Sequence, residues 1–229
     1  MSRETEPQEK IVETKEIISN AELYGEMKSV FNFNFVTGLP CGELRHFISE
    51  ASTDKEILHL PTSNEREAVG IATGAWLAGE KPVLYMQNSG LFLSSNDIGS
   101  LLLACKLPIP IVASWRGVPG ETATQHFATG AATEPLLTVF GVPHVSEANQ
   151  EQLEMLRRQM DQLQSPVCIL KIREKFNESP KAQISEPTQR QAGELFREGS
   201  GLQPLSREEA IFALLPKIKS LPLTEISLM

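Results

Sequence analysis

A few polar side chains stand at places in the chain where ligands are usually bound. Glu65 follows an expected strand and begins an expected helix, so its carboxylate can point into a cleft. Gln87, Asn88 and Ser89 end another strand, at the carboxyl edge of a parallel sheet where ligands usually bind. Arg116 follows a further strand, and its guanidinium fork matches the paired oxygens of an anionic group. These side chains are therefore candidates for lining a ligand-binding cleft.

Each of these positions also has a purely structural interpretation. Glu65 would complement the dipole of its helix from the first turn. The polar residues 87–89 would form an ordinary tight turn, and Arg116 would lie on a mobile loop. The residues alone leave these alternatives open.

The elements that must position these residues alternate between strands and helices. We expect strands at residues 34–37, 57–60, 83–87, 109–115, 142–145 and 167–172. We expect helices from Asn20 onward and at residues 41–50, 64–79, 94–106, 125–140 and 149–163. Most of the strands are apolar throughout, which is typical of a parallel sheet covered by helices on both faces. The sequence therefore predicts an α/β fold, a three-layer sandwich with a mainly parallel sheet.

Composition excludes several classes of protein. A formal net charge of −8 over 229 residues argues against a sequence-independent nucleic-acid binder, which needs basic surface. The longest apolar run, residues 100–115, is interrupted by a lysine and two prolines, so no membrane span is expected. The three cysteines lie far apart without a CxxC pair, which fits a reducing compartment. We expect a cytoplasmic protein.

The chain divides into four expected segments. A charged, flexible lead over residues 1–18 precedes an α/β domain at 19–173. Residues 174–204 have the composition of a linker, and residues 205–229 form a C-terminal helix and tail. The common signatures of nucleotide binding, metalloproteases and serine hydrolases are missing: GxGxxG, GK[ST], HExxH and GxSxG do not occur. The histidines show no metal-ligand spacing, and we expect no metal ligand on this chain.

Three sequence blocks nevertheless resemble a known family: TGLPC at 37–41, NEREAVG at 64–70 and YMQNSGL at 85–91. The segments SWRG at 114–117, PG at 119–120 and QH at 125–126 follow at fitting distances. In this order and spacing they resemble the thiamine-diphosphate-dependent decarboxylases of phosphonopyruvate and sulfopyruvate. The resemblance covers about residues 20–173 and implies the pyrimidine-binding (PYR) domain of such an enzyme.

The resemblance also implies a partner. The diphosphate-binding (PP) domain of this family carries GDG and a later Asn pair, which hold Mg²⁺ and the diphosphate, and this sequence contains neither. We therefore expect a separate PP-domain subunit that binds Mg²⁺, in a hetero-oligomer with at least two copies of each chain. A truncated single-chain enzyme and a non-catalytic PYR-like scaffold or regulatory subunit stay as alternatives.

By resemblance, Glu65 hydrogen-bonds the pyrimidine ring of thiamine diphosphate, and His126 relays a proton or orients the substrate. His126 would otherwise be a helix-start histidine packed on its loop. The expected cofactor-binding residues are Glu65, Gln87, Asn88 and Ser89. The expected substrate-binding residues are Pro40, Cys41, Asn88, Arg116, Gln125 and His126. The implied reaction converts phosphonopyruvate to phosphonoacetaldehyde and carbon dioxide, because the WRGxPG and QH segments look closer to that enzyme; sulfopyruvate is the alternative 2-oxoacid.

Overall fold

Six short segments form one parallel sheet in the part of the chain that the computed structural model describes, residues 17–172. The strands are β1 (Phe35–Gly38), β2 (Leu58–Pro61), β3 (Pro82–Gln87), β4 (Pro110–Trp115), β5 (His144–Ser146) and β6 (Val167–Ile172). Their order across the sheet is β2-β1-β3-β4-β6-β5, and every neighbouring pair is parallel. The predicted parallel sheet is confirmed.

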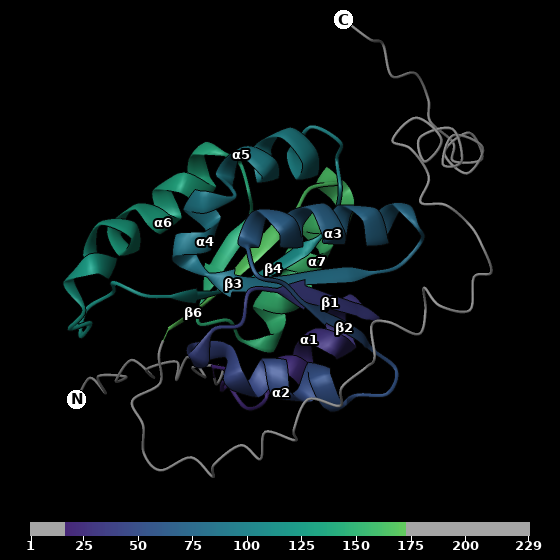
Figure 1. The fold of residues 1–229 in the computed structure, drawn as a ribbon, viewed down its shortest axis with the longest axis horizontal. Helices are drawn as coiled ribbons and strands as arrows, with labels where there is room; N and C mark the ends of the chain where they lie inside the picture. The colour runs from purple at the N-terminus through teal and green to yellow at the C-terminus, as the bar shows by residue number, and fades with distance from the viewer. Residues whose placement is uncertain (1–16, 173–229) are drawn as a thin grey trace, which may run out of the picture. The chain divides into compact units, whose positions relative to one another are not determined.

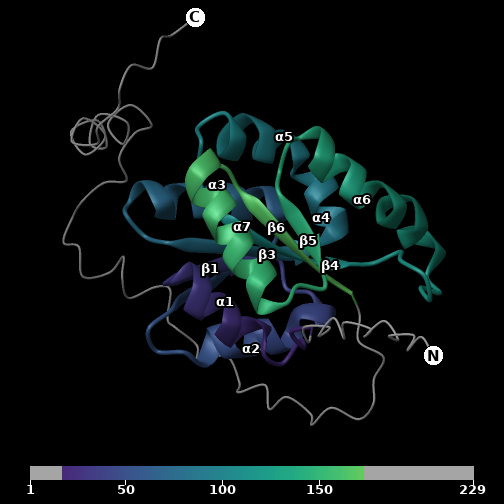
Figure 2. The same ribbon diagram turned by 180° about the vertical axis from the view of Figure 1, so that it is seen from behind.

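Helices cover both faces of this sheet. One face carries α1 (Leu23–Phe31), α2 (Arg45–Thr53) and α7 (Gln150–Leu163), and Figure 2 shows α7 beside α1. The other face carries α3 (Glu65–Leu77), α4 (Asn88–Leu93), α5 (Ser95–Asp97) and α6 (Phe127–Val139), as Figure 1 shows. The short segments η1 (Gly42–Leu44), η2 (Ile98–Leu103) and η3 (Thr124–His126) complete the described elements. This is the expected three-layer sandwich.

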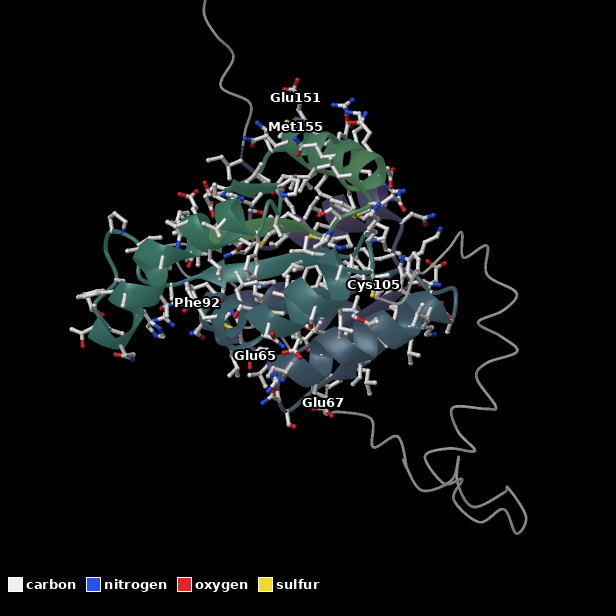
Figure 3. The ribbon with its side chains drawn as sticks, turned by 90° about the horizontal axis from the view of Figure 1, so that it is seen from above. Glu65, Glu67, Phe92, Cys105, Glu151 and Met155 are labelled. Atoms are coloured by element: carbon white, nitrogen blue, oxygen red, sulfur yellow. The ribbon has the colours of Figure 1, made fainter. Side chains whose placement is uncertain are left out.

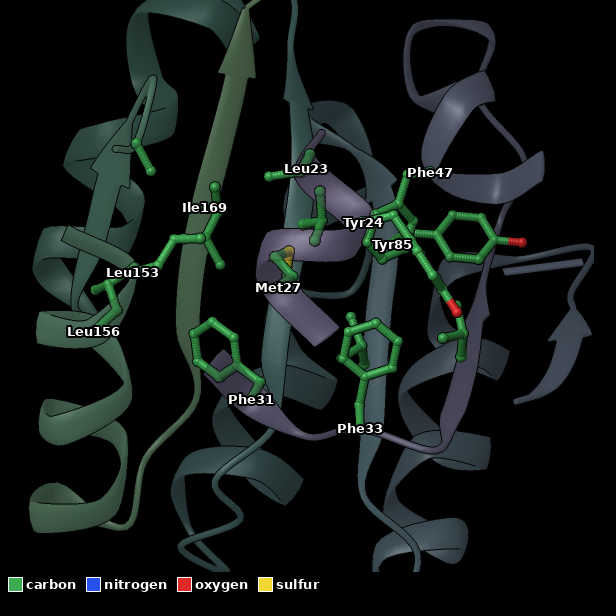
Figure 4. Packing of buried hydrophobic residues seen from close by; sticks show 14 of the residues in the cluster. Leu23, Tyr24, Met27, Phe31, Phe33, Phe47, Tyr85, Leu153, Leu156 and Ile169 are labelled. Carbon is green, nitrogen blue, oxygen red and sulfur yellow. The ribbon is translucent and has the colours of Figure 1, made fainter. Parts of the chain in front are cut away.

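Each face of the sheet has its own apolar core, because alternate strand residues point to opposite sides. On the α1 face, Leu23, Met27 and Phe31 recur at helical spacing and pack against the sheet beside Phe47 and Tyr85 (Figure 4). Burial of one such side chain stabilises the fold by about 1.5–3 kcal/mol. These cores make the sheet a rigid base for the loops at its edge.

The chain reverses its winding between β1 and β3. Helix α2, which follows β1, lies on one face, whereas α3, which follows β2, and α4, which follows β3, lie on the other. Since β1 and β3 are neighbours in the sheet, the segments that leave their carboxyl ends diverge to opposite faces and leave a crevice. Gly38 ends β1 so close to β3 that any Cβ there would overlap the Tyr85 carbonyl oxygen.

One predicted segment differs in the structure. We expected a helix over 94–106, with a tight turn at 87–89 only as an alternative, but Asn88 begins α4 directly, and η2 has π-helical geometry. The earlier start has a physical reason, because the Asn88 side chain is buried and hydrogen-bonded to a neighbouring loop and to α6. Asn88 therefore belongs to a helix rather than to a turn.

The structure leaves the predicted linker and tail untested, along with most of the predicted lead. The linker at 174–204, the helix and tail at 205–229 and most of the lead at 1–18 lie outside residues 17–172. Ile18, at the edge of the described part, is buried, and its amide donates to the Ala148 carbonyl. Among the described helices, none is long and apolar enough to cross a membrane.

His59 of β2 is held between two hydroxyl groups. Its Nδ1 lies 2.8 Å from Ser52 Oγ, and its Nε2 lies 3.0 Å from the Tyr85 hydroxyl oxygen. Burial lowers the pKa of His59 to about 4. Between an ordinary histidine pKa of about 6.5 and that value, the unfolded chain binds a proton that the folded chain does not. His59 therefore costs stability as the pH falls through this window.

We predict that His59→Gln reduces the loss of stability between pH 6.5 and 4. One proton contributes a slope of at most about 1.4 kcal/mol per pH unit, and this contribution should disappear in the variant. Urea unfolding at several pH values measures it, with His46→Gln as the control that removes a histidine from α2. Equal slopes in the wild type and His59→Gln would contradict the assignment.

Candidate functional site

The segments that follow β1, β2, β3 and β4 meet around one pocket at the carboxyl edge of the sheet. Its volume is about 350 Å³. The lining residues are Leu39, Pro40, Cys41, Gly42, Glu43, Glu65, Gln87, Ser89 and Arg116. The pocket thus lies at the crevice between β1 and β3, and it brings together six of the residues predicted for a cofactor or substrate site.

Glu65 provides a carboxylate that is nearly buried and has no partner among the described residues. Its exposed fraction is 6%, yet no group in residues 17–172 hydrogen-bonds or ion-pairs with its side chain. Buried carboxylates are normally paired, since an unpaired polar group in a protein interior is costly. The Glu65 carboxylate is therefore available to a ligand in the pocket.

Gly90 of α4 leaves the space that the Glu65 side chain occupies. A Cβ on Gly90 would lie 2.5 Å from Cγ of Glu65 and 2.7 Å from its Oε1. Real Cβ atoms do not approach other atoms so closely. The contact between α3 and α4 therefore requires glycine at this position.

Residues that do not line the pocket hold the first turn of α3 in place. Asn64 caps the helix, because its Oδ1 accepts a hydrogen bond of 2.8 Å from the Arg66 amide. The Arg66 side chain pairs with Asp97 at 2.7 Å, which ties α3 to α5 and lowers the pKa of Asp97. Glu67 is exposed and accepts hydrogen bonds from Ser63. Figure 3 shows Glu65 and Glu67 at the same end of α3.

Two of the three polar residues after β3 face the pocket, and the third does not. Gln87 and Ser89 line it, and Gln87 Nε2 donates to Ser89 Oγ at 2.8 Å. Asn88 is fully buried. Its amide nitrogen donates to the Arg116 carbonyl at 3.0 Å and to Thr133 Oγ1 at 2.9 Å, and its oxygen accepts from the Arg116 amide at 3.2 Å. Asn88 therefore holds the backbone of Arg116.

Arg116 is the positively charged group in the pocket lining. Its Nε donates to Glu121 Oε2 at 2.6 Å, and its Nη1 lies 3.7 Å from Glu43 Oε1. The other oxygen of Glu121 accepts from the amides of Thr122 and Ala123, both at 3.0 Å. The Arg116 hydrogen bond, followed by that of the Ala123 amide, lowers the pKa of Glu121 to about 2. Glu121 thus stays ionised and fixes the guanidinium.

Gln125 and His126 are not part of the pocket lining. They lie in η3, on the segment that follows Arg116 and leads into α6. Gly117, with φ of 83°, packs so tightly against the His126 carbonyl and the backbone of Gly130 that no side chain fits there. Their expected substrate and proton-relay roles therefore stay predictions, as does the direct ligand contact expected of Asn88.

The substrate side of the pocket also holds a thiol. Cys41 Sγ lies 3.2 Å from Ser114 Oγ, across the end of β4, and Pro40 lies beside it in the lining. Over residues 17–172, no cluster of histidine, cysteine and acidic residues has the makeup of a metal site.

Sequence reasoning missed three residues that shape the site: Glu43, Gly90 and Glu121. Glu121 follows Arg116 by five residues in a glycine-rich loop, so a local ion pair was a usable signal. Glu43 and Gly90 carried no local signal, because their contacts with Arg116 and Glu65 join segments far apart in the sequence.

Comparison with known proteins agrees with this geometry. No family model matches the chain. It is 38% identical over 141 residues to the sulfopyruvate decarboxylase subunit alpha of Methanococcus maripaludis, covering 60% of this chain and 84% of that subunit. It is also 38% identical over 103 residues to the phosphonopyruvate decarboxylase of Streptomyces viridochromogenes, covering 44% of this chain and 26% of that enzyme.

A solved structure shares the fold. The 2-oxoglutarate:ferredoxin oxidoreductase from Magnetococcus marinus aligns with a TM-score of 0.51 at 18% identity, over 74% of this chain and 31% of that one.

We predict that Gly90→Ala destabilises the protein, because the new methyl group displaces Glu65. Overpacking of this kind costs about 1–3 kcal/mol. Gly25→Ala is the matched control, since Gly25 lies in α1 with nothing within 4 Å of its would-be Cβ. In an open helix position, alanine should stabilise by up to about 1 kcal/mol. Urea unfolding compares the two; a Gly90→Ala protein as stable as Gly25→Ala would refute the close contact.

Proposed function

The chain belongs to the family of thiamine-diphosphate-dependent sulfopyruvate and phosphonopyruvate decarboxylases, and on this premise we propose that it is the PYR-domain subunit of a 2-oxoacid decarboxylase. The observation that carries the proposal is the nearly buried Glu65 carboxylate, which faces a pocket and has no partner among the described residues. A purely structural glutamate at a helix start needs no such pocket.

The residues present fit thiamine diphosphate. The pocket presents the carboxylate of Glu65, the amide of Gln87 and the hydroxyl of Ser89, which are hydrogen-bonding groups suited to a heterocycle with ring nitrogens and an amine. When bound, the cofactor supplies a carbon nucleophile that adds to the 2-oxo carbon and accepts the electrons released as carbon dioxide leaves. Glu65 would hold a proton in a hydrogen bond to the pyrimidine ring nitrogen.

The other residues of the chain bind and orient. Arg116 would receive the sulfonate or phosphonate of the substrate, since its Nη1 and Nη2 atoms donate no hydrogen bond to any described residue. Cys41 and Pro40 would contact the same part of the substrate. Gln125 and His126 would act from the η3 segment, His126 as a proton relay.

Sulfopyruvate is the substrate we favour, and phosphonopyruvate is the second candidate. Relatives named as sulfopyruvate decarboxylase alpha subunits match over 125–152 residues, and those named as phosphonopyruvate decarboxylases over 102–103. The preference expected from the sequence was the reverse. Both substrates carry a carboxylate and a second anionic group, so one cationic residue in the pocket serves either.

We further propose a PP-domain partner subunit that holds Mg²⁺ and the diphosphate. The name "subunit alpha" of the relatives supports a partner, because it denotes one component of a larger enzyme. A hetero-oligomer with at least two copies of each chain, acting in the cytoplasm, completes the proposal. Light scattering of the reconstituted complex measures the copy number.

We predict that Glu65→Gln lowers turnover by roughly 10²–10⁴-fold, because glutamine cannot exchange the proton that the pyrimidine requires. The assay uses the full chain reconstituted with its PP-domain partner, thiamine diphosphate and Mg²⁺, and follows aldehyde formation. Glu67→Gln is the matched control, since Glu67 lies in the same helical turn but is exposed and bonded to Ser63. Near-normal activity of a folded Glu65→Gln complex would overturn the mechanism.

We also predict that the wild-type complex releases an aldehyde from sulfopyruvate faster than from phosphonopyruvate, and that neither chain is active alone. The ratio of kcat/KM values for the two acids measures the preference. A stable complex that is inactive with both acids would instead support the non-catalytic scaffold.

A further inference from the structure

The guanidinium of Arg116 has two carboxylate neighbours that contact it in different ways. Glu121 forms a charge-assisted hydrogen bond of 2.6 Å to Nε and is itself held by two backbone amides. Glu43 lies 3.7 Å from Nη1, which is within ion-pair range but too long for a hydrogen bond. The first contact is built into the loop after β4, whereas the second reaches across the pocket from the segment after β1.

The position of Arg116 is otherwise fixed. Asn88 bonds both its amide and its carbonyl, so the backbone cannot shift without breaking buried hydrogen bonds. Its side chain is only 17% exposed, and the exposed part borders the pocket. A ligand therefore meets a guanidinium that is already oriented and whose terminal nitrogens donate no hydrogen bond within residues 17–172.

Charge creates a conflict at this site. Glu43, Glu65 and Arg116 line one small pocket, and Glu121 adds a further negative charge behind the guanidinium. A substrate with two anionic groups adds negative charge to a site where carboxylates already outnumber the cation. Of the two carboxylates beside the guanidinium, Glu43 has the longer contact with it and no hydrogen bond to it, so an incoming anion displaces the Glu43 contact more easily than the Glu121 contact.

We propose that Glu43 is a specificity-determining residue that competes with the acid group of the substrate for Arg116, while Glu121 is a positioning residue that keeps the guanidinium aimed into the pocket. In the absence of an anion, Glu43 lies within ion-pair range of Nη1, beside the stronger Glu121 contact at Nε. A sulfonate or phosphonate takes its place on Nη1 and Nη2, whereas a 2-oxoacid without a second charge leaves Glu43 where it is. The inference deepens the proposed function and rests on it.

Equilibrium binding tests the competition without turnover. The probes are 3-sulfopropanoate, which has the two anionic groups of sulfopyruvate but no oxo group to react, and propanoate, which has one. Calorimetry on the full chain with its partner subunit should show 3-sulfopropanoate binding roughly fivefold tighter to Glu43→Gln than to wild type, since an ion pair worth about 1 kcal/mol no longer has to be broken. Propanoate affinity should change less than twofold.

Other variants provide the controls. Arg116→Gln should weaken 3-sulfopropanoate binding at least about tenfold, because charge-assisted hydrogen bonds are lost. Glu56→Gln removes an exposed carboxylate that pairs with Lys28 and does not line the pocket, so it should leave both affinities unchanged. If thermal unfolding shows that Glu43→Gln is misfolded, Glu43→Ala replaces it. Unchanged or weaker binding to the folded Glu43 variant overturns the proposal, and so does an Arg116→Gln complex that binds like wild type.

Kinetics separate this inference from the proposed reaction. With sulfopyruvate, Glu43→Gln should lower KM severalfold while kcat stays within twofold. With pyruvate, KM should not move. An inactive wild-type complex that nevertheless shows the binding pattern would overturn the decarboxylase function and support Glu43 as a competitor. An active complex without the pattern would overturn the role of Glu43 alone.

Discussion

The opposite faces to which α2 and α4 lead the chain away from β1 and β3 create the space on which the whole site depends. Because β1 and β3 are hydrogen-bonded neighbours, the segments after them must diverge, and side chains from four strand ends line the gap between them. The two apolar cores hold this edge rigid from both sides. A pocket built in this way has fixed walls, so the groups that line it keep their orientation without a ligand.

Close approaches of backbone and side chain determine which groups reach the pocket. Gly38 lets the end of β1 lie against Tyr85, and Gly90 lets α4 lie against the Glu65 side chain. Gly117 and Gly130 bring the loop after β4 onto α6 in the same way. At each contact the missing Cβ, rather than any attraction, decides how near two segments lie. The site is therefore sensitive to small changes of volume at residues that take no part in its chemistry.

Polar groups in the site fall into two sets with different energetic roles. Asn88, Thr133 and Glu121 are satisfied by hydrogen bonds within the protein, and they fix the position of Arg116. Glu65 is left without a partner in the described part of the chain. The part of this side chain that stays exposed borders the pocket, where a ligand can supply the missing interaction. One set thus fixes the guanidinium, and the other leaves a carboxylate available to a ligand in the pocket.

The sequence by itself determined the elements and their class. Alternating apolar strands and helices predicted the covered parallel sheet, and strand ends predicted which polar residues gather at its carboxyl edge. Four of these five residues, Glu65, Gln87, Ser89 and Arg116, do meet in one pocket. Local pattern was sufficient there, because burial periodicity and strand direction depend on neighbours in the chain.

Only the tertiary structure decided which of these residues face the pocket and which hold another residue in place. Asn88 has the same local pattern as Gln87 and Ser89, yet its side chain points into the protein and holds Arg116. Arg116 was expected to bind the substrate, but nothing in the sequence indicated that Glu43, 73 residues earlier, contacts the same guanidinium. The side a residue faces at a strand end, and the charges it meets, depend on segments that are distant in sequence and adjacent in space. No local pattern encodes them.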